Sequence, residues 1–115
     1  MLLHITDALT WQTALQSGIY VAPSLESEGF IHCSTPAQVL GPANAFYHGQ
    51  TNLLLLCITP AQVRSPIVYE DCYQTGQAVP HIYGPLNLDA IAHVVDFPPC
   101  PDGTFCLPEA LALLL

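Results

Sequence analysis

The sequence predicts an α+β domain in which two helices pack on a small, mixed or mainly antiparallel β-sheet. The chain has 115 residues, the length of one domain, and 51% of them are hydrophobic, which suffices for one core and argues against disorder. Short apolar runs bounded by turn residues dominate the second half, as in strands. The helical patterns lie mainly in the first half, without the alternation of a βαβ fold, so we expect an α+β rather than an α/β arrangement.

The first elements are a strand and a capped helix. Residues 2–6 form a short apolar segment in which alternate side chains face opposite ways, as in a strand. Thr6 and Asp7 are both suited to cap the helix that follows, and Gly18 is suited to end it. Within this helix Trp11 is expected to be a core anchor.

The next segment is predicted to contain two strands and a second helix. A strand over 19–21 stops before Pro23, and another covers 29–34. Thr35-Pro36 is a favoured helix start, so a helix is expected from there to Phe46, bent at Gly41-Pro42.

The second half is predicted to contain mostly strands. Its continuous apolar run has the composition of a central strand buried on both faces. The expected elements are strands over 53–58, 67–70 and 91–97, a helical turn over 59–62, a rigid proline-bounded segment over 80–86, a turn over 87–90 and a short helix from 108.

The charge balance limits the possible partners. The chain has nine acidic residues and one basic residue, Arg64, which gives a formal net charge of −8. Recognition of a nucleic-acid backbone uses several lysine or arginine contacts, so a nucleic-acid partner is not expected, and an anionic membrane surface is disfavoured for the same reason. No targeting segment or run of about 20 apolar residues is visible, so we expect a cytoplasmic protein.

The five cysteines do not form a recognisable framework. Their number is odd, their spacing is irregular, and no CxxC pair occurs, so neither a disulfide scaffold nor a zinc knuckle is predicted. Cys57 closes an apolar run and is expected to be buried. Cys100 and Cys106 flank a turn-rich loop and can approach each other without a bond being required.

Titratable side chains interrupt several apolar runs. These residues are His4, His32, Glu70, His81 and Tyr83. A buried polar group without a partner costs about 1–3 kcal/mol, so these groups are expected to pair with one another. A single histidine in a strand is more often structural than catalytic, but three such positions in one small domain favour a shared pocket. His81 and Tyr83, two residues apart, are expected to share a face.

Three other residues are weaker candidates. His48 lies beside a glycine and is expected to be a solvated loop residue, whereas His93 fits a structural or a functional role. Cys33 next to His32 is a poor nucleophile and base pair, because adjacent strand residues face opposite ways.

Several sequence blocks carry a family resemblance. They are Trp11, Gly18–Tyr20, Ser24-Leu25, Glu28–Ser34, Gln38-Val39, Tyr69-Glu70 and Pro80–Leu86. Together they resemble the bacterial family of unknown function called DUF952 over residues 2–97. The resemblance implies a domain over residues 1–97 and a C-terminal extension over residues 98–115 that packs on the same domain.

The DUF952 resemblance also implies an ADP-ribosyltransferase-like fold, a split, mostly antiparallel β-sandwich that holds NAD in a cleft. In such enzymes a histidine bonds the ribose, an aromatic ring stacks on nicotinamide, and a glutamate stabilises the oxocarbenium-like transition state. His4, Tyr20 and Glu70 match this order along the chain, whereas His32, His81 and Tyr83 do not map onto it and would define a variant pocket. The expected catalytic residues are His4, His32, Glu70 and His81, and the expected substrate-binding residues are Tyr20, Ser34, Tyr83 and Gly84.

Three functions remain open on these grounds. The first is a nucleotide-using enzyme or nucleotide-binding domain with NAD as its substrate and no resident cofactor, although the NAD pyrophosphate would bring two negative charges to an acidic chain. The second is a non-catalytic module that binds or senses a small molecule. The third is a metal-assisted hydrolase using His4, His32 and His81, which requires their ring nitrogens to lie within about 4 Å of one another.

Overall fold

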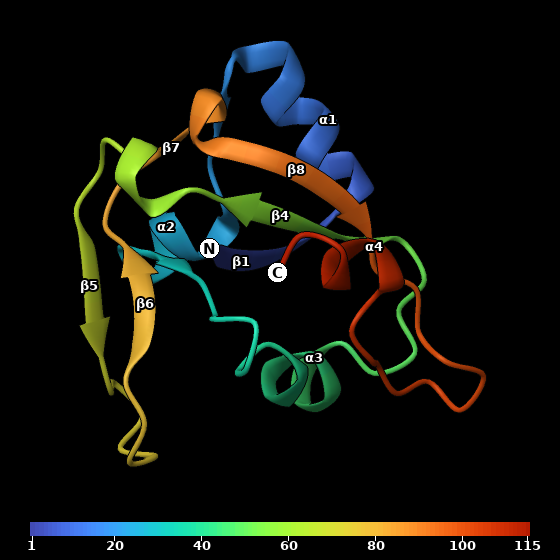
Figure 1. Ribbon diagram of the computed structural model, residues 1–115. Coiled ribbons are helices and arrows are strands. Elements are labelled where there is room, and N and C mark those ends of the chain that lie inside the picture. Colours follow the sequence, from blue (N-terminus) through green and yellow to red (C-terminus); the bar gives the residue numbers. More distant parts are fainter.

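The computed structural model describes residues 1–115 and confirms the α+β class (Figure 1). Short strands and short helices alternate as far as β4, and β5, β6 and β7 then follow one another without a helix between them. No helix combines the length and the apolar character needed to cross a bilayer. In chain order the elements are β1 (Leu2–Asp7), α1 (Ala8–Ser17), β2 (Ile19–Tyr20), α2 (Pro23–Ser27), β3 (Ile31–His32), α3 (Leu40–Phe46), β4 (Leu53–Ile58), the 3₁₀ turn η1 (Pro60–Gln62), β5 (Ile67–Glu70), β6 (Val79–Ile82), β7 (Leu86–Asn87), the 3₁₀ turn η2 (Leu88–Ala90), β8 (Ile91–Asp96) and α4 (Glu109–Ala112).

All strand pairs are antiparallel, and they form three small sheets. The largest has the order β1-β4-β8, so β4 is the central strand, as its continuous apolar run predicted. A second sheet has the order β3-β6-β5, and β2 pairs with β7. Leu3 and Ser34 exchange two backbone hydrogen bonds, of 2.7 and 2.8 Å, which connect the first sheet to the chain just after β3.

The core has two parts, one on each face of the β1-β4-β8 sheet. Leu2 and Leu56 belong to the part that includes Ala14 of α1, whereas Leu3 and Leu55 belong to the part that includes Ala43 of α3. Alternate residues of β1 and β4 therefore face opposite layers. Figure 1 shows α1 and α3 on opposite sides of this sheet.

The first helix has the predicted caps. The Asp7 carboxylate accepts a hydrogen bond of 2.7 Å from the backbone N–H of Thr10, and Gly18 ends the helix with φ 83°. This left-handed backbone conformation favours glycine.

We expect the change Asp7→Ala to lower the free energy of unfolding by about 1 kcal/mol, because it leaves an N–H group of the first turn without its acceptor. Asp7→Asn keeps a capping oxygen and should retain most of the stability. Urea denaturation of the two variants measures the difference, and equal losses in both would contradict the capping role.

The prediction for the second helix was wrong at its start. Residues 36–39 form turns, and α3 begins only at Leu40, so Gly41-Pro42 lies in its first turn rather than at a bend. A proline in the first turn removes no intrahelical hydrogen bond, which explains why the helix begins there. Phe46, the last residue of the helix, is 76% exposed, although it is apolar.

Two further elements differ from the prediction. The strand expected over 29–34 is reduced to Ile31–His32, with Ser34 adding one isolated bridge. The helix α2 was not predicted, although Pro23 occupies a first-turn position that favours a helix start.

Residues 98–115 pack against the domain. Phe105 and Leu111 are buried in the same part of the core as α3. The backbone N–H of Phe105 donates to Asn44 Oδ1 at 2.8 Å, and that of Gly49 donates to the Gly103 carbonyl at 2.9 Å. Leu115, at the end of this segment, is exposed.

Candidate functional site

One cavity of about 890 Å³ lies between β1, the segment after β3, α3 and the loop that joins β5 to β6. Its volume is in the range of about 300–1,000 Å³ that is typical of small-molecule sites. Of the residues predicted from the sequence, the cavity is lined by His4, Tyr20, His32 and Ser34, whereas Glu70, His81, Tyr83 and Gly84 lie outside its lining.

His4 is a buried link between strands. Its Nδ1 donates to the His32 carbonyl at 2.5 Å, because a carbonyl oxygen can only accept, and its Nε2 lies 2.7 Å from the hydroxyl of Tyr20. That hydroxyl also lies 2.8 Å from the Thr6 hydroxyl. Burial lowers the pKa of His4 to about 4 and raises the pKa of Tyr20, so both are neutral at pH 7. Since both ring nitrogens are engaged, His4 shapes the site rather than presenting a free nitrogen to it.

A more accessible group of polar side chains surrounds Glu28. His32 Nε2 donates to Glu28 Oε2 at 2.7 Å, and the Tyr73 hydroxyl donates to Glu28 Oε1 at 3.0 Å. These two hydrogen bonds hold the pKa of Glu28 below its usual range, so the carboxylate is ionised at neutral pH. The rings of His32 and Tyr73 stack with centroids 6.2 Å apart. All three residues line the cavity, and we call them the Glu28 triad.

Neither Glu28 nor Tyr73 was predicted as a site residue. Glu28 is four residues before His32, and this spacing was the one local signal for the pair. Tyr73 is 45 residues from Glu28 in the sequence, so its contact depends on the tertiary fold.

Glu70, His81 and Tyr83 form a second, similar group beside the first. His81 is fully buried, and its Nδ1 donates to Glu70 Oε1 at 2.8 Å. The Tyr83 hydroxyl donates to the same oxygen, as expected if His81 and Tyr83 share a face. These hydrogen bonds lower the pKa of Glu70 and raise the pKa of Tyr83 to about 12. The ring of Phe30 stacks on the imidazole of His81 with centroids 4.1 Å apart.

The two groups are neighbours because β3 and β6 pair. His32 and His81 are directly opposite in the register, and their ring centroids are 5.4 Å apart. Seven of the eight predicted site residues thus lie in the two Glu–His–Tyr groups or in the cavity lining, and only Gly84 lies in neither. The seven are His4, Tyr20, His32, Ser34, Glu70, His81 and Tyr83.

The three histidines of the metal-hydrolase hypothesis do not converge. His4 uses both of its ring nitrogens in contacts with His32 and Tyr20, and His32 Nε2 is bonded to Glu28. The structure has one group of three metal-ligating side chains, and it contains only His81 of the three histidines. The geometry therefore does not support a zinc centre made from His4, His32 and His81.

Gly84 has a structural position. Its φ of 151° is rarely adopted by residues with side chains, and a Cβ at this position would lie 2.5 Å from Ser65 Oγ. The Ser65 hydroxyl in turn donates to the Pro85 carbonyl at 2.7 Å. The close packing of these two segments is enough to explain why position 84 is a glycine, and no ligand contact is needed to account for it.

The remaining candidates from the sequence are two histidines and two cysteines. His48 is exposed, and His93 is exposed on β8. Cys57 is buried, as predicted, and so is Cys33, whose thiol has its pKa raised to about 12 by burial, which argues against a nucleophilic role at neutral pH.

The cavity is lined by carboxylates but by no side chain with a permanent positive charge. Asp7, Glu28 and Asp71 are its three carboxylates, and no arginine or lysine lines it. Arg64, the single arginine of the chain, instead forms an exposed ion pair with Asp89 at 2.9 Å. The cavity therefore favours ligands that are neutral or positively charged where they enter it.

The comparisons with known proteins place the chain in a family. Residues 5–94 match the family described as "Protein of unknown function (DUF952)". The chain belongs to the DUF952 family. No curated protein matches it.

Solved structures of one bacterial protein have the same fold as this DUF952 chain. The crystal structure of protein CC0527 from Caulobacter crescentus is 27% identical, covers 96% of this chain and 97% of its own, and superimposes with a TM-score of 0.86. The solution NMR structure of CC0527 is 26% identical, covers 97% of both chains and has a TM-score of 0.76. The similarity thus extends beyond residue 94 into the C-terminal segment.

Proposed function

We propose that the cavity binds the nicotinamide-ribosyl end of NAD or a related nucleotide, with the Glu28 triad as its recognition centre. The observation that carries this proposal is the meeting of an ionised carboxylate, an imidazole and a tyrosine ring at the wall of one cavity. Such a combination suits a ligand with hydroxyl groups, an aromatic ring and a positive charge. The expectation of an ADP-ribosyltransferase-like fold points to the same ligand class, and the small antiparallel sheets are compatible with a split sandwich of that kind.

Electrostatics favour one orientation of this ligand. The oxidised nicotinamide ring carries a positive charge, which the carboxylates of Asp7, Glu28 and Asp71 attract. The pyrophosphate carries two negative charges and finds no arginine or lysine in the lining. The ribosyl and nicotinamide groups therefore occupy the cavity, and the phosphates extend to solvent.

The Glu28 triad also has the groups needed for ribosyl transfer. When the bond between ribose C1′ and the nicotinamide nitrogen breaks, its electron pair goes to nicotinamide and leaves a positively charged ribosyl group. The Glu28 carboxylate stabilises that charge. Water or an acceptor hydroxyl then bonds to C1′ and gives up a proton. In this proposal His32 accepts that proton at Nδ1, because its Nε2 already donates to Glu28.

A non-catalytic binding module is the second candidate. Both nitrogens of His4 are engaged within the protein, and Glu70 lies outside the cavity lining. Two of the three residues that match the ADP-ribosyltransferase order along the chain, His4 and Glu70, are thus not free to act on a ligand in the cavity. Nicotinamide release from NAD, measured by chromatography, separates an enzyme from a binding module.

We expect the change Glu28→Gln to weaken the binding of nicotinamide riboside, because it removes a negative charge that attracts the nicotinamide ring. The expected loss is about tenfold, because this carboxylate is solvent-exposed and its charge is partly screened. Isothermal titration calorimetry measures this effect. The matched control is Glu26→Gln, since Glu26 is exposed on α2, two residues before Glu28, and does not line the cavity. Equal affinities in the two variants, or tighter binding of ADP-ribose than of nicotinamide riboside, would contradict the proposal.

A further inference from the structure

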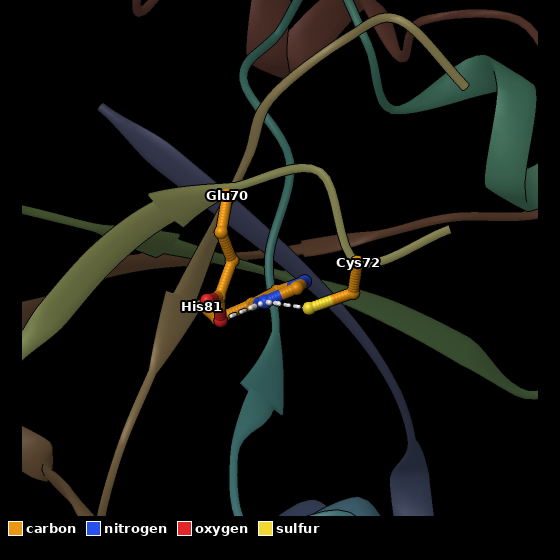
Figure 2. Close-up of side chains that lie close together, drawn as sticks. All are labelled: Glu70, Cys72 and His81. Atoms are coloured by element: carbon orange, nitrogen blue, oxygen red, sulfur yellow. Dashed lines mark hydrogen bonds and ion pairs between the residues drawn. The ribbon is translucent and has the colours of Figure 1, made fainter. Parts of the chain in front are cut away.

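Glu70, Cys72 and His81 bring three different metal-ligating atoms together at the edge of the cavity. One carboxylate oxygen, the thiol sulfur and an imidazole nitrogen lie within 4.8 Å of one another. Glu70 ends β5, Cys72 follows it in the loop, and His81 lies within β6 (Figure 2). Figure 2 shows the side chains of Glu70 and Cys72 directed to the same nitrogen of the imidazole.

The spacing of these atoms is close to that of a metal site. His81 Nδ1 is 2.8 Å from Glu70 Oε1 and 3.9 Å from Cys72 Sγ. Zinc bonds are about 2.0–2.2 Å to nitrogen and oxygen and about 2.3 Å to sulfur, so ligand atoms of a tetrahedral site are about 3.3–3.8 Å apart. Movements of about 1 Å in the exposed Cys72 and half-buried Glu70 side chains suffice to reach this geometry.

The imidazole is held in a fixed orientation. Phe30 stacks on its ring, and the ring is fully buried. Its other nitrogen, Nε2, is buried without a hydrogen-bond partner. All polar contacts of His81 are thus concentrated on Nδ1, the nitrogen that faces Glu70 and Cys72.

The second ligand is oriented as well. The Tyr83 hydroxyl donates to Glu70 Oε1. Outer groups of this kind, which fix the position of a ligand, are typical of metal sites. Cys72 is exposed and lines the cavity, so an ion can reach the three ligands from solvent.

We propose that Glu70, Cys72 and His81 bind one Zn²⁺ ion, with a fourth coordination position open towards the cavity. Zinc binding moves the imidazole proton of His81 from Nδ1 to Nε2 and releases the thiol proton of Cys72 to solvent. A thiolate, an imidazole and a carboxylate form a donor set that suits zinc, whereas Mg²⁺ and Ca²⁺ prefer oxygen ligands alone. Three protein ligands with one open position are typical of zinc sites that bind a further molecule. The site does not depend on nucleotide binding, so each of the two proposals can fail without the other.

Cobalt titration of the reduced full-length protein tests the zinc site. Co²⁺ takes the place of Zn²⁺, and a thiolate ligand to it gives a charge-transfer absorption in the near ultraviolet. We expect this absorption to saturate at one equivalent and to disappear when Zn²⁺ is added. Cys72→Ser should remove it and weaken zinc binding, measured by competition with a chromophoric chelator, by tenfold or more.

The matched control is Cys106→Ser. Cys106 is also exposed, and its sulfur lies 3.4 Å from Cys100 Sγ, so these two thiols are the most plausible competing metal ligands in the chain. We expect Cys106→Ser to retain the cobalt spectrum. Loss of the spectrum in Cys106→Ser with retention in Cys72→Ser would overturn the proposal, as would a wild-type protein that gives no such absorption.

A second ligand must be tested with a variant that leaves the core intact. Because His81 is fully buried, its replacement can unfold the domain, so Glu70→Gln is the better second test. The glutamine retains an acceptor for Tyr83 but is a much weaker metal ligand. We expect zinc affinity to fall by tenfold or more while the amide spectrum of the folded protein is preserved, and unchanged affinity would contradict a role for Glu70.

Discussion

Replacing Phe105 by alanine is expected to lower the free energy of unfolding by about 3–5 kcal/mol. Phe105 is 5% exposed, and its ring lies 4.8 Å from that of Phe97 in the part of the core that also contains Leu3 and Leu55. Truncation to alanine removes this apolar contact area and leaves a cavity next to the central sheet. The effect is large for a residue that lies outside the family match over residues 5–94.

Urea denaturation measures this loss, and Leu113→Ala is its control. Leu113 lies in the same C-terminal segment but is 81% exposed, so its replacement should change the stability by less than about 0.5 kcal/mol. If both variants lose the same small amount, residues 98–115 do not contribute to the core as described.

Acidification from pH 7 to pH 4 is expected to remove about 3 kcal/mol of stability through His4 alone. The pKa of His4 is about 4 in the folded protein, because the ring is buried, and 6.5 is its ordinary value, which applies to the unfolded chain. Between these values the unfolded state binds more protons than the folded state. Stability is therefore fully present above pH 6.5 and is lost as the pH falls towards 4.

The variant His4→Gln isolates this contribution from that of the carboxylates. It should be less stable than wild type at pH 7, because it loses hydrogen bonds to His32 and Tyr20. Its stability should nevertheless fall less steeply between pH 6.5 and 4.5. Urea titrations at several pH values give both slopes, and parallel slopes would mean that His4 is not the buried neutral group described.

Local sequence signals correctly predicted those elements that depend on interactions between residues close together in the chain. The caps of α1 at Asp7 and Gly18 and the continuous apolar run of β4 identified these elements correctly. The start of α3 was misplaced because Thr35-Pro36 and Gly41-Pro42 both resemble helix starts, and the choice between them depends on which side chains reach the core. Val39 and Ala43 do so, whereas Phe46 does not.

The candidate site was predictable only in part for a similar reason. His32, His81 and Tyr83 interrupt apolar runs, and this pattern identified them as polar groups that need partners. Glu28 and Tyr73 interrupt no such run, so the position of Glu28 four residues before His32 was the one local signal for either of them. Their contact with each other spans 45 residues and exists only because the loop after β5 folds back over α2 and β3.

Chemical-shift mapping with nicotinamide riboside tests the central claim, that the Glu28 triad is the recognition centre of a ligand cavity. Isotope-labelled protein is titrated while its backbone amides are followed. The account predicts localised shifts at Glu28, His32, Ser34 and Tyr73, with smaller shifts for ADP-ribose. No shifts at millimolar ligand, or shifts confined to the exposed Arg64–Asp89 pair on another part of the surface, would contradict it.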